Sequence, residues 1–557
     1  MGTISTNLRV GDAEDLQNRA APVRSVDAVV IGAGFSGIYM THKLRQLGLS
    51  AVCIEKGAGV GGTWYWNRYP GARVDTHSVE YSYSFSDEIQ QEFDWNDVMP
   101  TQPDVERYLN FVTDRLDLRP HLVLGTTVTR LTFDEATSRW RVETDGSENC
   151  DAQFVVAATG ALSIPIEPDI PGLDTFAGET LYTNRFPAEG FDFRHRRVGV
   201  IGTGSSGIQC VPVIAEQADQ LYVFQRSAAY SRPSIARPFL PGELDAIKEQ
   251  YPAIRARERA AFGGLIWLNA IERDGPPPDR KILDTPLEER MKVLDELGWE
   301  APLAWADVLT DLEANDAARE LYAELVRRVV QDPETAASLV PHYPMGCKRL
   351  VLDVGYYQAF NRPNVRLVDL RKGGIVRVTP SGVETAGGDF SIDVLVCATG
   401  FDAITGALKR IEIRGRGGRA LSQTWGEHGP LAYLGLQIPG YPNLFTVNGP
   451  GSPSVLTNMV VAIEQHVEWI ADCIGYLRDR NLSTIEATLQ ASEEWALHVG
   501  SLAEGSVRTA DSCQSWYLGD NVPGKERLFL PYVGGLPRYR DHCQEVADEG
   551  YTGFRLG

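Results

Sequence analysis

Two stretches of the chain share one order of apolar and polar positions. In each, a short apolar run, Val26–Ile31 or Val198–Ile201, leads into a glycine-rich turn. Apolar residues then recur at helical spacing before a second apolar run. A continuous apolar run predicts a strand buried on both faces, and the i, i+3, i+4 spacing predicts an amphipathic helix. The pattern predicts two strand–turn–helix–strand units, and therefore an α/β fold with two Rossmann-like dinucleotide-binding domains.

The first turn has the spacing Gly32-x-Gly34-x-x-Gly37, and the strand after its helix leads into Glu55. Glycines permit a tight turn and close approach of a phosphate, and the helix N-terminus offers unpaired N–H groups to a pyrophosphate. An acid after the second strand accepts hydrogen bonds from ribose hydroxyls. Glycine spacing alone also occurs in turns that bind no phosphate, but strand, helix and acid in register favour a dinucleotide site.

The second turn repeats the spacing as Gly202-x-Gly204-x-x-Gly207, but its second strand ends in Gln225 and Arg226. An acid at this place suits the free 2′-hydroxyl of NAD, whereas an arginine suits a 2′-phosphate. We therefore expect FAD at the first site and NADPH at the second. The alternative for Arg226 is a solvated surface arginine without a ligand.

Residues 231–341 differ from both units, because they are rich in charged residues and alanine with helical periodicity, interrupted at Pro276–Pro278. Strands at 154–162 and 393–406 end in small residues, where the chain would cross between domains. We expect a tail (1–25), the first part of the FAD domain (26–160), the first part of the NADP domain (161–230), a helical insertion (231–341), the second part of the NADP domain (342–396) and the second part of the FAD domain (397–557).

Composition narrows the class of protein. The 557 residues are 43% hydrophobic and 23% charged, typical of a globular protein, with a net charge of −21. This charge argues against nucleic acid or an anionic membrane as a partner. The first 25 residues lack an apolar core, and no run of 18 apolar residues occurs. These features predict a cytoplasmic protein without a membrane partner.

The chain has eight cysteines, without a CxxC pair or a cysteine–histidine cluster of metal-ligand spacing. Cys53 and Cys397 lie in apolar runs, which predicts buried free thiols, a reducing compartment and no metal site. A pyridine-nucleotide disulfide reductase shares doubled nucleotide folds but needs a redox cysteine pair. The sequence shows no such pair, which argues against that class.

An aromatic-rich stretch follows the first unit: Gly61–Trp66, then Tyr69–Gly71, Arg73 and Asp75. Such density is usually core packing. The glycines before it and the acid after a Pro-Gly turn equally suit a loop over a planar cofactor.

This stretch carries a family resemblance. The chain resembles the type I Baeyer–Villiger monooxygenases, closest to their phenylacetone and steroid monooxygenase branch. The residues Gly61–Trp64, Tyr69–Gly71 and Asp75 fill the family's long motif, the two glycine turns flank it in family order, and residues 515–525 and 532–540 agree as well. One departure lies in the linker fingerprint after Phe176 and Gly178, where Tyr182 and Phe186 stand in place of the family's histidine and tryptophan.

The resemblance implies an NADPH- and O2-dependent flavoprotein that converts ketones to esters or lactones through a C4a-peroxyflavin. It implies that Arg349 stabilises the peroxide, that Asp75 positions Arg349, and that Lys348 and Arg226 hold the 2′-phosphate. Without the family, Arg349 and Asp75 would be an ordinary ion pair between domains. The FAD residues expected are Gly32, Gly34, Phe35, Ser36, Gly37, Glu55, Lys56, Gly62, Thr63, Trp64, Tyr65, Trp66, Asp75, Tyr81, Val128 and Met459. Those expected for NADP are Arg73, Gly202, Thr203, Gly204, Ser205, Ser206, Gly207, Gln225, Arg226, Lys348, Arg349 and Trp516.

Two further classes stay open beside this one. A heteroatom-oxygenating flavin monooxygenase shares the doubled folds and, at the linker, a smaller aromatic, but lacks the long motif that ends in Asp75. A non-catalytic nucleotide-sensing flavoprotein would not need Asp75, Lys348 and Arg349. The small, apolar stretch 449–458 admits cyclic, aryl or steroidal ketones and does not select among them.

Overall fold

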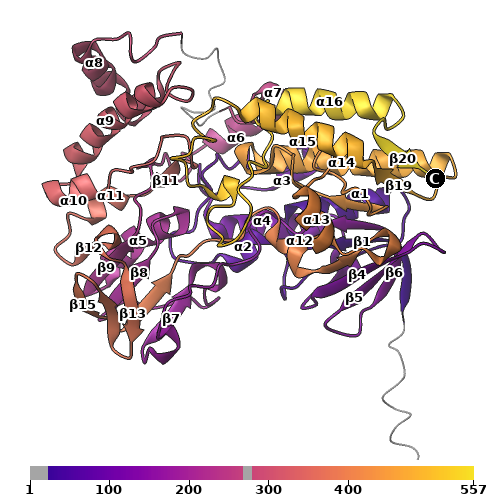
Figure 1. The fold of residues 1–557 in the computed structure, drawn as a ribbon, viewed down its shortest axis with the longest axis horizontal. Coiled ribbons are helices and arrows are strands. Elements are labelled where there is room, and N and C mark those ends of the chain that lie inside the picture. Colours follow the sequence, from indigo (N-terminus) through magenta and orange to yellow (C-terminus); the bar gives the residue numbers. More distant parts are fainter. Residues whose placement is uncertain (1–22, 267–278) are drawn as a thin grey trace, which may run out of the picture.

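The computed structural model describes residues 23–266 and 279–557. Figure 1 shows two sheet-based parts side by side, with β1, β4, β5 and β6 in one and β7, β8, β9 and β12 in the other. The expected break at Pro276–Pro278 and nearly all of the N-terminal tail lie outside the described residues. The α/β fold with two dinucleotide-binding units is confirmed, because both units have the predicted strand–turn–helix–strand order.

The first sheet has eight strands, ordered β17-β4-β5-β6-β1-β2-β3 with β18 paired to β6. β1 supplies its two faces alternately: Ala28 and Val30 pack into one apolar cluster, and Val29 and Ile31 into another. Burial on both faces explains the continuous apolar run. The strands are β1 (Arg24–Ile31), β2 (Ala51–Ile54), β3 (Leu122–Val123), β4 (Val128–Asp134), β5 (Arg139–Thr144), β6 (Cys150–Ala157), β17 (Glu412–Arg414) and β18 (Leu444–Thr446).

The second sheet is parallel throughout, in the order β12-β9-β8-β16-β7. Its strands are β7 (Glu179–Tyr182), β8 (Arg197–Ile201), β9 (Gln220–Gln225), β12 (Val365–Asp369) and β16 (Val394–Cys397). An antiparallel ribbon of β13 (Ile375–Thr379), β14 (Gly382–Thr385) and β15 (Gly388–Ser391) precedes β16, and the short pairs are β10 (Ser231–Pro233) with β11 (Val351–Asp353) and β19 (Ile485–Ala487) with β20 (Phe554–Leu556).

Helices cover both sheets, and α14, α15 and α16 lie together above the first one in Figure 1. None of the helices in the described ranges is long and apolar enough to cross a membrane. The α-helices are α1 (Phe35–Gln46), α2 (Thr63–Trp66), α3 (Asp87–Glu92), α4 (Gln102–Arg115), α5 (Ser205–Gln217), α6 (Glu243–Lys248), α7 (Tyr251–Ala260), α8 (Leu287–Leu297), α9 (Leu312–Val329), α10 (Pro333–Ser338), α11 (Tyr356–Ala359), α12 (Gly406–Arg410), α13 (Leu421–His428), α14 (Met459–Asp479), α15 (Leu489–Ala503) and α16 (Leu536–Asp548).

The cysteines correct one expectation. Cys53 and Cys397 are buried free thiols, as their apolar runs predicted. Cys347 and Cys513, however, form a disulfide across a sequence separation of 166 residues. The expectation of buried free thiols rested on Cys53 and Cys397, and no pairing was expected for Cys347 and Cys513, because a cysteine scan by spacing finds only partners that are close in sequence.

Candidate functional site

Both glycine-rich turns place an open helix N-terminus at the end of a buried strand. α1 follows Gly34 and α5 follows Gly204, and neither N-cap has a side chain bonded to the first N–H groups. A Cβ on Gly32 would lie 2.6 Å from a backbone oxygen after β6, and one on Gly202 would lie 2.3 Å from the matching oxygen after β16. Only glycine fits these turns, and their exposed N–H groups fit the pyrophosphate of a dinucleotide.

Glu55 does more than the sequence predicted. Its Oε2 accepts a 2.7 Å hydrogen bond from Ala33 N, and its Oε1 accepts a 2.7 Å bond from Gly57 N. Its side chain is buried, and burial raises the pKa of this carboxyl although both N–H groups favour its charged form. Glu55 therefore ties the first phosphate turn to the next turn.

The aromatic stretch is packed against the first phosphate turn. Residues 63–66 form the single turn α2, a helix where we had weighed a loop. Trp64 Nε1 donates to Tyr81 Oη at 3.2 Å, and Tyr65 Oη accepts from Ala58 N at 3.1 Å. Burial raises the pKa of Tyr81 to about 12, so its hydroxyl stays protonated. A Cβ on Gly62 would lie 3.0 Å from the Cα of a first-turn glycine, which explains the glycine before α2.

The Pro-Gly turn of the long motif docks onto the helix of the second nucleotide unit. Tyr69 Oη donates to Gln209 Oε1 at 2.8 Å, and Gln209 Nε2 donates to Arg73 O at 3.0 Å. A Cβ on Gly71, whose φ is +82°, would lie 2.3 Å from Gln209 O. The motif thus joins the two domains just before Asp75.

Asp75 and Arg349 form the expected pair. Arg349 Nε donates to Asp75 Oδ2 at 2.6 Å and Nη2 donates to Oδ1 at 3.2 Å, while Nη1 donates to Val455 O at 3.0 Å. The two side chains are 29% and 30% exposed, at the wall of one cavity. A bidentate pair of this kind fixes the plane of the guanidinium.

The cavity wall extends beyond the predicted site residues. Beside the charged pair, the wall contains a further cation, Arg508, and the side chains of Leu350, Leu352, Val455, Leu456 and Tyr517. Val455 and Tyr517 pack in one apolar cluster with the predicted residues Met459 and Trp516. Leu352 lies in the short strand β11 and Met459 begins α14, while the others come from loops and from the short 3-10 turns at 454–456 and 516–518, where no periodic pattern marks them.

The second site keeps its cations accessible. Arg226 is exposed at the end of β9, whereas Gln225 is buried and its Nε2 donates to Ser338 O at 2.8 Å. Lys348 lies 4.4 Å above the ring of Tyr343. Burial first, and the charge of Arg226 second, lower the pKa of Lys348. Two cations close enough for the charge of one to lower the pKa of the other suit a dianionic phosphate.

The other predicted residues lie near the two nucleotide sites or form part of the surrounding fold. Arg73 is occupied, because its Nη1 donates to Met99 O at 2.6 Å. Lys56 is exposed, with its ammonium 5.5 Å from the ring of Trp66. Val128 is buried at the start of β4. Thr203 Oγ1 donates to Ser227 O at 2.7 Å, within the second turn.

The two linker residues that differ from the family fingerprint, Tyr182 and Phe186, support the strands of the second sheet. Tyr182 ends β7, which pairs with β16, and the guanidinium of Arg185 lies 3.7 Å from its ring. Phe186 is 5% exposed. Both side chains therefore support the second sheet, in agreement with a linker that positions a domain.

Known proteins are similar to this chain in sequence and in structure. A family described as pyridine nucleotide-disulphide oxidoreductase matches residues 29–260. An acetone monooxygenase (methyl acetate-forming) from Gordonia sp. is 39% identical over 96% of this chain and 99% of its own. A phenazine N-monooxygenase from Lysobacter antibioticus is 38% identical over 95% and 97%. The structure of an oxidized steroid monooxygenase bound to NADP superposes with a TM-score of 0.88, at 46% identity, covering 96% of this chain and 99% of that one.

Proposed function

This chain belongs to the Baeyer–Villiger monooxygenases, flavoproteins that use FAD, NADPH and O2 to convert ketones into esters or lactones, and we propose that Arg349, positioned by Asp75, is its catalytic cation. FAD held at the first turn would supply the redox chemistry between NADPH and O2. The open N-termini of α1 and α5 fit the two dinucleotides, with Glu55 toward the first, and Arg226 and Lys348 toward the second.

Arg349 is suited to hold negative charge on oxygen. Its guanidinium does not give up a proton near neutral pH, so it stabilises an oxyanion without protonating it. Asp75 and the carbonyl of Val455 fix its plane before substrate arrives. This fixed cation would stabilise the negative charge that develops on the ketone oxygen during oxygen insertion.

The apolar part of the cavity wall has a second task. Leu350, Leu352 and Leu456 line the cavity beside the charged pair, and their apolar surface would limit the water there once a substrate fills the cavity. Exclusion of water strengthens the field of Arg349 and suppresses loss of the oxidant as hydrogen peroxide. A ketone fits this wall because its apolar body replaces water while its carbonyl meets the cation.

The bidentate Asp75–Arg349 pair at the cavity carries this proposal, and Arg349→Ala tests it. Ester formation should fall by about 10²–10³-fold, the effect of removing a fixed oxyanion donor, while bound FAD and anaerobic reduction by NADPH persist. Arg139→Ala is the matched control, because Arg139 in β5 forms an ion pair with Asp151 in β6 at similar exposure, and neither residue lines the cavity. Near-normal ester formation by Arg349→Ala would show that another cation does this work.

Heteroatom oxygenation is the second candidate, favoured by the similarity to a phenazine N-monooxygenase. The two reactions differ in substrate, since a ketone needs oxyanion stabilisation whereas an amine or sulfide needs an oxidant that can be protonated. A panel of ketones, tertiary amines and sulfides, with products identified by mass, separates them. We expect ketones to be the better substrates and Asp75→Asn to lower their turnover more than that of amines.

A further inference from the structure

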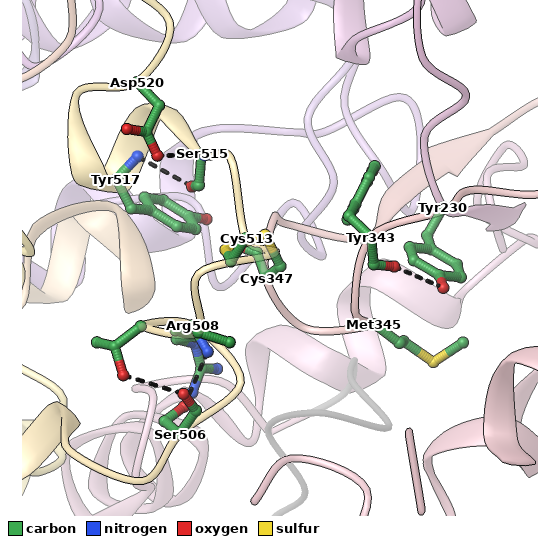
Figure 2. The surroundings of a disulfide bond; sticks show 12 residues. Tyr230, Tyr343, Met345, Cys347, Ser506, Arg508, Cys513, Ser515, Tyr517 and Asp520 are labelled. Carbon is green, nitrogen blue, oxygen red and sulfur yellow. Dashed lines mark hydrogen bonds between the residues drawn. A yellow bond between two sulfur atoms is a disulfide. The ribbon is translucent and has the colours of Figure 1, made fainter. Parts of the chain in front are cut away.

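The disulfide lies at the cavity rather than in a remote part of the fold. Cys347 directly precedes Lys348 and Arg349, and Cys513 lies three residues before Trp516. Figure 2 shows the bond between the two segments, with Arg508 and Tyr517 on the C-terminal one. Both cysteines are fully buried.

The two bonded segments form one wall of the same cavity. Residues 346–350 bring Lys348 and Arg349 to it, and the C-terminal segment brings Arg508 and Tyr517. The second segment also packs into the core of the NADP domain through Cys513 and Leu518. The relative placement of these two segments therefore sets where the cations lie.

Hydrogen bonds fix each segment on the side away from the cavity. Asn315 of α9 donates through Nδ2 to Met345 O at 2.9 Å and accepts through Oδ1 from Met345 N at 2.8 Å. Val507 N donates to Leu309 O at 3.0 Å, just before α9. Both segments are therefore anchored near the start of α9, by Asn315 and by Leu309, and the disulfide joins them a second time close to Arg349.

Resting on the proposed function of this cavity, we propose that Cys347 and Cys513 are positioning residues for Arg349, Lys348 and Trp516. Their covalent bond limits sliding of the C-terminal segment against the turn that carries both cations. Misplacement of a reacting group by about 1 Å costs on the order of 10²-fold in rate. Loss of the bond should therefore lower oxygenation and NADP+ retention while the flavin remains bound.

The bond itself is tested by alkylation of the unfolded holoenzyme with iodoacetamide, without and with prior reduction. Dithiothreitol breaks the S–S bond by supplying two electrons and two protons, which gives two thiols and the cyclic disulfide of the reagent. Of eight cysteines, six should be labelled before reduction and all eight after it. Eight labelled cysteines in the unreduced protein would overturn the proposal.

The role is tested with Cys347→Ala, Cys513→Ala and the double variant. If the bond acts, each single variant should lower ester formed per NADPH oxidised as much as the double variant, because either removes the bond. Ester formation should fall by up to about 10²-fold, with weaker NADP+ binding. Cys210→Ala is the control, since Cys210 is a buried free thiol in the same apolar cluster.

Two outcomes count against positioning. Unchanged ester per NADPH in all three variants would show that the bond has no role at the cavity. Additive losses, with the control equally affected, would show that the side chains act through packing alone. Ester formation by the unmodified enzyme is measured in the same series, so a failure of the proposed function is recognised separately.

Discussion

The two nucleotide turns have the same backbone and opposite polar surroundings. In the first, the strand-end acid Glu55 is 5% exposed and both its oxygens accept backbone N–H groups. In the second, the strand-end Arg226 is exposed, and the buried residue before it, Gln225, bonds to the protein frame. One turn is completed by its own buried side chain, whereas the other has an exposed cation beside it.

This difference separates structural from binding roles of residues at equivalent positions. An acid that accepts buried N–H groups is needed for the turn itself, so its loss should affect folding and FAD together. An exposed arginine that contacts no buried group should affect only what it binds. The site residues between the two turns, Asp75 and Arg349, depend on how the domains meet.

The largest effect is expected for Glu55→Ala. The N–H groups of Ala33 and Gly57 would be buried without an acceptor, at roughly 1–3 kcal/mol each, and the turn that meets the pyrophosphate would loosen. We expect a lower free energy of unfolding and loss of FAD on gel filtration, followed by flavin absorbance. Glu216→Ala, at an exposed position of α5, should change neither. A Glu55→Ala protein that keeps full stability and FAD would contradict this account.

Gly71→Ala tests the contact between the domains. Its Cβ would lie 2.3 Å from Gln209 O, and alanine disfavours a φ of +82°, so we expect a cost of about 2–4 kcal/mol. Because Asp75 follows this turn, ketone oxygenation should fall further than NADPH-driven flavin reduction. Gly190→Ala is the matched control: its φ is +78°, with nothing within 4 Å of the added Cβ. Equal effects of the two substitutions would show that backbone conformation alone matters.

The elements with a local pattern could be predicted from sequence. Both glycine turns and their strands obey short-range rules, since buried parallel strands need apolar runs and phosphate turns need glycine. The cysteine bond and the roles of Gly71 and Gln209 could not be predicted in this way. They depend on which segments meet in space, and the separation of 166 residues between Cys347 and Cys513 leaves no mark on local sequence.

The residues of the candidate site also divide into those that a sequence motif predicts and those that depend on which segments meet in space. Asp75 and Arg349 were expected from the family motif, and the structure brings them together as a bidentate pair. Arg508 was missed, because a loop residue that lines a cavity carries no periodicity, whereas Val455 and Tyr517 lie in the stretches 449–458 and 515–525, which were singled out without a role for either residue. The second role of Glu55, in holding Ala33 and Gly57, was missed because a backbone partner is invisible in sequence.

A smaller and more selective effect is expected for Arg226→Ala. The exposed guanidinium is proposed to bind the 2′-phosphate, so the preference for NADPH over NADH should fall by roughly 1–3 kcal/mol. Stability and FAD content should stay unchanged, in contrast to Glu55→Ala. Steady-state kcat/KM for both coenzymes measures this, with Arg196→Ala, another exposed arginine, as control. An unaltered preference would remove Arg226 from the phosphate site.

The smallest effect is a shift in the pH dependence of coenzyme binding. Burial and the charge of Arg226 lower the pKa of Lys348 from its ordinary value of 10.5, so as pH rises this lysine loses its charge earlier than usual. Binding of NADP+, whose 2′-phosphate is ionised above neutral pH, should therefore weaken on the alkaline side.

In Arg226→Ala the second cause is gone and burial remains, so the pKa of Lys348 should rise and the alkaline weakening should move to higher pH. The affinity for NADP+, measured from neutral to alkaline pH in both proteins, gives the shift. NAD+, which lacks the phosphate, should show no such alkaline weakening. Alkaline weakening at an unchanged pH would mean that burial alone lowers the pKa of Lys348. Alkaline weakening that moves to lower pH would mean that Arg226 and Lys348 do not share one phosphate.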